Sequence, residues 1–364
     1  MYSEDRDAFR YVLGVSRVKL TYHPFEVHKR VPLAISRGTQ STSRGWEVRV
    51  LYDGIEAIGE ASEFSLPGHE QSAEGIEADL ERAVPLVRQF SPWQRTECEA
   101  AMRQHSIGSA AITGIDMALY DWMGRATHQP VWRLLGLSAE VHVANSVTIG
   151  ISAPESAQQR LVSWMEIGVI RAVKIKMGSK EGVEDDQARF EAVRKLVPDT
   201  TRIGVDANGG WQTKDAIAMC KWLADRGVDH VEQPTAPGDT DALRSVHYGS
   251  PIPILADEAC LTSRDIPGLL GACSGINIKL SKCGGLSEAI RMIATARAHG
   301  LKVMLGCYSQ TSLANTAANQ LASLADYIDL DSHLNLKNDP YSGCRFENGY
   351  LFNRDLPGLG VTHA

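Results

Sequence analysis

The sequence predicts an α/β protein: a modified TIM barrel of the (β/α)7β kind, preceded by an N-terminal α+β capping domain. From about Val141 onward, short apolar strands alternate with amphipathic helical stretches, which is the pattern of βαβ units in a parallel sheet. Eight such strands can be counted, and the eighth is followed by a tail rich in Gly and Pro instead of another helix. Eight strands at this spacing favour a closed barrel over an open sheet.

A chain of 364 residues is long enough for a large barrel with an appended domain. We expect the capping domain over residues 1–135 and the barrel over residues 136–334. The C-terminal segment, residues 335–364, is expected to pack back on the capping domain and complete it.

The first part of the chain combines strand and helix signals. Asp53-Gly54 lies between two β-rich stretches in residues 46–59, which is a strong signal for a two-residue hairpin. Three later stretches have apolar positions three and four apart and are predicted to be helices: residues 72–90, 95–105 and 109–126.

The barrel strands are predicted at residues 141–149, 171–177, 202–206, 229–232, 254–257, 276–280, 302–306 and 327–331. In six of them apolar residues alternate with other residues, and alternate side chains of a strand face opposite ways. If the apolar rows face the helices, the charged residues face the barrel axis. Each of these charges lies near the carboxyl end of its strand, where barrel enzymes hold their active sites.

Three of the inward residues are carboxylates on consecutive strands: Asp206, Glu232 and Asp257. They are separated by one βα unit each, so the strands should present them side by side. Such a cluster repels itself without a cation, and oxygen ligands with no His or Cys pair nearby favour Mg²⁺ over zinc. His230 shares the face of Glu232 but lies two residues deeper, and we interpret it as a packed histidine beside the site.

Two lysines should flank this cluster. Lys176 on the second strand and Lys279 on the sixth would lie across the barrel from each other. A lysine must be neutral to accept a proton, and the like charge of Lys174 is one means of lowering the pKa of Lys176. Lys282 competes with Lys279 for the second role, but it lies beyond the apolar alternation and is interpreted as a loop cation.

This constellation can remove the α-proton of a metal-bound carboxylate substrate, because the metal stabilises the enediolate that forms. If the second lysine returns a proton on the opposite face, the α-carbon inverts. If it only guards the intermediate, elimination or cycloisomerisation results. The residues alone leave both outcomes open.

The motifs that contain these residues resemble the enolase superfamily, in its muconate lactonizing enzyme subgroup, over about residues 13–361. The resemblance implies that Lys176 and Lys279 are the two acid/base lysines and that the three carboxylates are the Mg²⁺ ligands. The matching motifs are Lys174-Ile175-Lys176, Asp206-Ala207-Asn208, Glu232-Gln233-Pro234, Asp257-Glu258, Lys279-Leu280 with the Gly284-Gly285 pair, and the helical stretch from Ile115 to Asp121.

Asp329-Leu330-Asp331 resembles the DxD motif of dipeptide epimerases, in which two carboxylates receive the free α-ammonium of the substrate. The resemblance implies a dipeptide, which carries an ammonium at the end away from its metal-bound carboxylate. Alternatively, the two aspartates bind Lys or Arg from the N-terminal domain. Thr148 falls where related epimerases hold the substrate backbone.

Further candidates for contact with the substrate are Lys174 and Gln310, although related epimerases often have an acid where Gln310 stands. That difference leaves the side-chain specificity open. The polar segment 24–44 is long enough to be a lid that chooses the side chain, or it is merely a mobile surface loop.

The leading hypothesis is therefore an Mg²⁺-dependent dipeptide epimerase, an isomerase that moves a proton at the α-carbon of the C-terminal residue. Other reactions of the same subgroup are the alternatives: N-acylamino acid racemisation, dehydration of a hydroxy acid, or elimination as in o-succinylbenzoate synthase. A non-catalytic ligand-binding barrel is a more distant alternative, against which the two lysines argue.

The bulk properties exclude other classes of partner. A net charge of −7 with no run of Lys or Arg argues against nucleic acid or an anionic membrane. The first ten residues carry three acids and no apolar core, which is unlike a signal or transit peptide. Seven cysteines without CxxC spacing fit reduced thiols. We expect a cytoplasmic enzyme with a small-molecule substrate, and the sequence allows a homo-oligomer.

Overall fold

The computed structural model describes residues 17–140 and 142–364. Three sequence-based expectations fall partly or wholly outside these ranges. They concern the first ten residues, the beginning of the family resemblance before residue 17, and Val141 of the first predicted strand. None of the helices within them is long and apolar enough to span a membrane.

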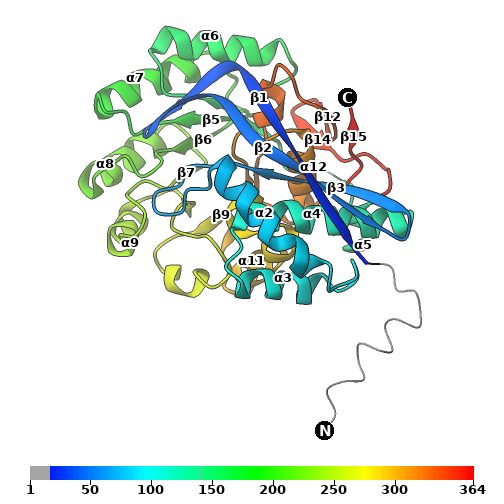
Figure 1. Ribbon diagram of the computed structural model, residues 1–364. Helices are drawn as coiled ribbons and strands as arrows, with labels where there is room; N and C mark the ends of the chain where they lie inside the picture. Colours follow the sequence, from blue (N-terminus) through cyan, green and yellow to red (C-terminus); the bar gives the residue numbers. More distant parts are fainter. Residues whose placement is uncertain (1–16, 141) are drawn as a thin grey trace.

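Eight parallel strands form the central sheet, so the predicted barrel fold is confirmed (Figure 1). Each strand pairs with the next strand along the chain. The sheet closes where β11 meets β4, through a parallel bridge between Asn145 and Ile328 and a 2.8 Å hydrogen bond from the Leu330 N–H to Asn145 Oδ1. The strands are β4 (Ser146–Ile149), β5 (Ala172–Lys176), β6 (Arg202–Asp206), β7 (His230–Glu232), β8 (Ile254–Ala256), β9 (Gly275–Lys279), β10 (Lys302–Gly306) and β11 (Tyr327–Asp329).

Helices cover the outside of the barrel, where they bury the apolar strand rows such as Val173 and Ile175. The connection between β8 and β9 differs from the others, because it holds only the 3-10 turn η1 (Ile266–Leu269) instead of an amphipathic helix. Pro267, Gly268 and Gly271 disfavour a longer helix there. The helices are α6 (Pro154–Met165), α7 (Val183–Arg194), α8 (Thr213–Ala224), α9 (Thr240–Gly249), α10 (Leu280–Cys283), α11 (Leu286–Ala298) and α12 (Ser312–Asn319).

The N-terminal part folds as predicted into an antiparallel sheet with helices against it. Its strands are β1 (Lys19–Ile35), β2 (Gly38–Tyr52) and β3 (Ile55–Ser62), and its helices are α2 (Ala73–Val87), α3 (Arg95–Gln104), α4 (Ser109–Ala126) and the short α5 (Val131–Leu134). Asp53 and Gly54 both have positive φ, which suits the tight hairpin turn between β2 and β3. A Cβ at Gly59 would lie 2.0 Å from the Gly114 carbonyl oxygen, so α4 packs closely on β3 because both positions are glycine.

The segment 24–44 is a β-hairpin, so the prediction of a polar loop is wrong. β1 and β2 pair along almost their whole length, with an irregularity between His28 and Leu33, and they turn at residues 36–37 (Figure 1). This ribbon is exposed on much of its surface, and an exposed ribbon lacks the apolar alternation that marks a half-buried strand.

The C-terminal tail packs on both the capping part and the barrel. The Leu359 N–H donates to Asp121 Oδ1 of α4 at 2.8 Å, and the Tyr341 hydroxyl donates to Glu47 of β2 at 2.6 Å. On the barrel side, the Cys344 N–H donates to Thr316 Oγ1 of α12 at 2.8 Å. The tail contains β12 (Tyr341–Ser342), β13 (Arg345–Glu347), β14 (Tyr350–Phe352) and β15 (Thr362–His363). The division into residues 1–135, 136–334 and 335–364 stays a prediction.

Candidate active site

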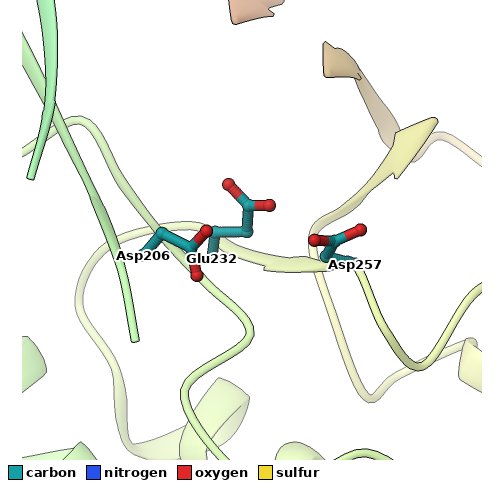
Figure 2. A group of neighbouring side chains, drawn as sticks. All are labelled: Asp206, Glu232 and Asp257. Carbon is teal, nitrogen blue, oxygen red and sulfur yellow. The ribbon is translucent and has the colours of Figure 1, made fainter. Parts of the chain in front are cut away.

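Three buried carboxylates meet at the carboxyl ends of β6, β7 and β8. Asp206 and Glu232 end their strands and are direct partners in the β6–β7 register, and Asp257 follows the last residue of β8. Their ligand oxygens lie within 4.8 Å of one another. Figure 2 shows the three side chains on the neighbouring strands. The strand register therefore brings together the cluster that the spacing of one βα unit predicts.

The electrostatics of this cluster fit a divalent cation. All three side chains are fully buried. Burial, together with the charges of Asp206 and Asp257, raises the pKa of Glu232 to about 7. Carboxylates that oppose one another in this way need positive charge between them, and an all-oxygen donor set suits Mg²⁺.

Lys176 and Lys279 flank the cluster from different strands. Lys176 ends β5, and its Nζ donates to Asp206 Oδ2 at 2.5 Å. Lys279 ends β9, and its Nζ donates to Asp257 Oδ2 at 2.7 Å. Both lysines line the same cavity. The barrel thus holds one ammonium beside each of the two outer carboxylates.

Lys174 does not have the position that the sequence suggested. Its Nζ donates to Glu232 Oε2 at 2.5 Å and to Asp329 Oδ2 at 2.6 Å, and its side chain is buried below the cavity, which it does not line. Burial alone would lower the pKa of Lys174, but the carboxylates of Asp329 and Glu232 outweigh it and raise this pKa. Lys174 is therefore a buried cation compensated by two carboxylates and does not line the cavity; its contact with the substrate stays a prediction that this position does not favour.

Lys282 lies in the short helix α10, not in a loop. Its Nζ donates to the Asp257 carboxylate at 2.7 Å, to the Asp257 carbonyl at 2.6 Å and to the Asn277 carbonyl at 2.9 Å. Burial would raise the pKa of Asp257, but the ammonium groups of Lys279 and Lys282 hold it well below its usual range. Three hydrogen bonds fix Lys282 away from the cavity, where it orients Asp257.

His230 is packed beside the site, as predicted. Its ring is buried against Tyr327 with centroids 4.3 Å apart, and neither ring nitrogen has a hydrogen-bond partner among the described residues. Burial is the main cause that lowers the pKa of His230 to about 3, and the nearby charge of Lys174 lowers it further. The imidazole is neutral and offers the carboxylate cluster no ligand of its own.

Asp329 and Asp331 both line the cavity but have different partners. Asp329 accepts hydrogen bonds from Lys174 and from the Ser146 hydroxyl. Asp331 accepts one from the Thr148 backbone N–H at 2.6 Å, and no Lys or Arg of the described chain forms an ion pair with it. Burial is the main cause that raises the pKa of Asp331 to about 6, and the negative charge of Asp329 also contributes to this rise.

The alternative that the N-terminal domain supplies a cation to this pair does not hold within the described part of the chain. The cation beside Asp329 comes from β5 of the barrel, and Asp331 has none within ion-pair distance. Asp331 is therefore the member of the pair without a direct ion-pair partner in the described chain, although the charge of Arg160, which lines the same cavity, acts to lower its pKa.

The other two residues predicted to contact the substrate, Thr148 and Gln310, differ in whether they line the cavity. Thr148 on β4 lines the cavity. Gln310 does not: its Nε2 donates to the Ser281 hydroxyl at 2.8 Å, and its Oε1 accepts from the Tyr308 N–H at 3.3 Å. The expected contact of Gln310 with a substrate is therefore not supported, because these bonds hold its amide under the loop that follows β10.

The cavity has a volume of about 450 Å³ and lies between the barrel mouth and the β1–β2 hairpin. Arg37 at the hairpin tip forms a 2.8 Å ion pair with Glu258 and donates to the Asn208 carbonyl at 3.0 Å. The hairpin also contributes apolar lining from Val31, Leu33 and Ile35.

Sequence reasoning missed several residues around the cavity. Asn208 has positive φ, and its side-chain amide donates to Asp206 at 3.1 Å and to Glu258 at 3.3 Å. It lies in the Asp-Ala-Asn motif, which was a usable signal. Phe64 and Tyr308 also line the cavity, and no pattern in the sequence marked either of them or Arg37.

Comparisons with known proteins agree with this geometry. Residues 18–136 match the family model of the mandelate racemase / muconate lactonizing enzyme N-terminal domain, and residues 153–364 match the enolase C-terminal domain-like model. Two similar proteins are named hydrophobic dipeptide epimerase. The one from Flavobacteria bacterium (strain MS024-2A) is 40% identical, with 94% of this chain and 98% of the relative covered. The one from Roseobacter litoralis is also 40% identical, with 95% and 100% covered.

Solved structures show the same likeness. A dipeptide epimerase from Enterococcus faecalis, in complex with Mg and the dipeptide L-Leu-L-Tyr, has a TM-score of 0.89 at 29% identity, with 95% of this chain and 100% of that chain covered. An L-Ala-D/L-Glu epimerase from Bacillus subtilis, in a substrate complex, has a TM-score of 0.90 at 27% identity, with 96% and 99% covered. With matches to both domain models and relatives at 40% identity over nearly its whole length, the chain belongs to the mandelate racemase / muconate lactonizing enzyme family of the enolase superfamily.

Proposed function

We propose that this chain is an Mg²⁺-dependent dipeptide epimerase, an isomerase that inverts the α-carbon of the substrate's C-terminal residue. The observation that carries the proposal is the pair of lysines. Lys176 and Lys279 come from β5 and β9, bind different carboxylates and line one cavity. An inversion needs a proton taken from one face and returned on the other, and two separated ammonium/amine groups supply both steps.

Asp206, Glu232 and Asp257 would hold the metal. When bound, Mg²⁺ stabilises the negative charge that develops on the substrate carboxylate as the α-proton leaves. The Mg in the Enterococcus faecalis complex supports this choice of ion.

The lysines handle the protons. The neutral amine of one lysine takes the α-proton at its Nζ, and the ammonium of the other gives a proton from its Nζ to the opposite face. For the reverse reaction the two exchange roles, so either epimer is a substrate. Their ion pairs with Asp206 and Asp257 hold both Nζ atoms at the edges of the carboxylate cluster.

Asp331 would bind the free α-ammonium of the dipeptide. It is buried in the cavity wall, accepts a hydrogen bond from the Thr148 backbone N–H, and has no Lys or Arg within ion-pair distance among the described residues; the nearest cationic influence is the more distant Arg160 of α6, which lines the same cavity. A substrate ammonium would compensate this carboxylate, whereas an N-acylated amino acid would leave it without a charged partner.

The side-chain preference would be apolar. Val31, Leu33 and Ile35 of the hairpin and Phe64 after β3 contribute apolar surface to the cavity. Burial of an apolar substrate side chain against them is favourable by about 25 cal/mol per Å². The names of the two relatives at 40% identity support this preference.

The test is incubation of the protein with Mg²⁺ and a dipeptide library in D2O, followed by mass spectrometry. Dipeptides with apolar C-terminal residues should gain one deuterium at the α-carbon and yield both epimers. N-succinylated amino acids, hydroxy acids and succinylbenzoate precursors, assayed in parallel, separate the alternatives. Deuterium uptake by none of the dipeptides would refute the proposal.

A cytoplasmic location is part of the proposal. All seven cysteines are free thiols and most are buried, which fits a reducing compartment. Fractionation of the source cells, with detection by antibody, would test it; enrichment outside the cytoplasmic fraction would contradict it.

A further inference from the structure

We propose that Tyr308 is a positioning residue for Lys279: the face of its ring, held in place by Phe64 of the capping part, fixes the Lys279 ammonium in its reactive position. This inference rests on the proposed function for its kinetic consequence. The positioning itself can be measured without any activity.

Tyr308 follows β10 and places its ring against the end of the Lys279 side chain. The Lys279 Nζ lies over the Tyr308 ring, 4.7 Å from its centroid, and 2.7 Å from Asp257 Oδ2. An ammonium within about 6 Å of an aromatic face is attracted by the ring quadrupole. A lysine ammonium lies at the end of a flexible four-carbon side chain. Simultaneous contact with a ring and a carboxylate restricts this side chain to few rotamers.

The Tyr308 ring is itself held in place by a second aromatic ring, that of Phe64. Phe64 stacks on Tyr308 with centroids 4.7 Å apart and planes inclined by 12°. Backbone hydrogen bonds in both directions between Phe64 and Gln71 hold Phe64, and the backbone N–H of Tyr308 is bonded to Gln310. Tyr308 is thus placed between the capping part and one of the two lysines.

The other lysine lacks such a support. Within residues 17–140 and 142–364, no aromatic ring forms a cation–π contact with Lys176, whose ion-pair partner is Asp206 alone. Loss of the Tyr308 ring should therefore affect the proton step at Lys279 and spare the one at Lys176. A purely structural residue would affect both steps together.

The kinetic test compares α-proton exchange in D2O from the two epimers of one dipeptide. Lys279→Ala identifies the epimer whose exchange depends on Lys279. Tyr308→Leu should lower the exchange rate of that epimer by about tenfold relative to the exchange rate of the other epimer. Phe64→Leu should shift the ratio of the two rates in the same direction by less. Tyr308→Phe keeps the ring face and should keep the wild-type ratio.

The activity-independent test is NMR of protein labelled with ¹³Cε-lysine. The ε-methylene signal of Lys279, assigned by its loss in Lys279→Ala, should be shifted upfield by the Tyr308 ring in the wild type and in Tyr308→Phe. In Tyr308→Leu it should move to the usual lysine position. If the signal is already unshifted in the wild type, or if Tyr308→Leu lowers both exchange rates equally, the inference is overturned. Absence of exchange in the wild type would instead refute the proposed function, while the NMR result still decides the position of Lys279.

Discussion

Replacement of Asp331 by Asn tests the ammonium site. The substitution keeps the size of the side chain and an acceptor for the Thr148 N–H, but it removes the buried negative charge. Loss of one partner of a buried, hydrogen-bonded charge pair costs about 2–5 kcal/mol. Each 1.36 kcal/mol is about tenfold in rate, so kcat/KM for a free dipeptide should fall by roughly 30-fold to several thousandfold.

The assay is the epimerisation rate of one dipeptide and of its N-acetyl derivative, followed by chiral chromatography. The wild type should strongly prefer the free dipeptide, and Asp331→Asn should lose most of that preference. Asp199→Asn is the matched control, because Asp199 is fully exposed on the surface. A variant that keeps its preference for the free dipeptide would refute the reasoning, as would a wild type that uses both compounds equally.

The same site predicts a pH dependence. The pKa of Asp331 is raised to about 6, so this carboxylate is protonated below that pH and cannot pair with an ammonium. The value of kcat/KM for the free dipeptide should therefore decrease as pH falls through about 6. In Asp331→Asn, this part of the pH profile should be absent.

Three further substitutions test the carboxylate cluster, its buried cation and the hairpin. Glu232→Gln should abolish the rise in Tm that Mg²⁺ gives the wild type, a stabilisation of about 2.7 kcal/mol at 100 times Kd; an unchanged rise would contradict the metal assignment. Lys174→Met leaves two buried carboxylates without their cation and should lower the free energy of unfolding by about 3–5 kcal/mol in urea titrations, compared with almost none for exposed Lys180→Met. Arg37→Ala breaks the ion pair with Glu258 and should raise KM more than it changes kcat, with faster proteolysis of the hairpin; equal resistance to protease would show that the tip is held otherwise.

The barrel and its charge cluster could be predicted because strands obey a simple rule. Alternate residues face opposite sides, so an apolar row on a strand such as Ile203 and Val205 leaves Asp206 facing inward. One βα unit between successive acids then places them on neighbouring strands. That reasoning needs no knowledge of side-chain packing, and the register of β6 and β7 agrees with it.

Depth within the barrel could not be predicted in the same way. Lys174 and Lys176 share a face, but Lys174 lies two residues deeper and pairs with Glu232 and Asp329 instead of reaching the cavity. Gln310 is withdrawn by a hydrogen bond to Ser281, a partner 29 positions away. Such pairings depend on loops that meet only in the folded chain.

The hairpin formed by β1 and β2 escaped prediction for a different reason. It is held by backbone pairing and by contacts of its tip with the barrel, such as Arg37 with Glu258, while few side chains of β1 and of the first part of β2 are buried. Polar composition therefore indicated a loop. The cavity lining that chooses the substrate side chain comes largely from this segment, so it is the part of the site that sequence patterns described least well.

The two-lysine mechanism is tested most directly by Lys176→Ala and Lys279→Ala, each incubated with Mg²⁺ in D2O and, separately, with either epimer of a dipeptide that the wild type converts. Each variant should fail to epimerise, and each should lose α-proton exchange from one epimer, with the two variants losing opposite epimers. If both variants still interconvert the epimers at the wild-type rate, or if both lose exchange from the same epimer only, the assignment of one lysine to each face is contradicted.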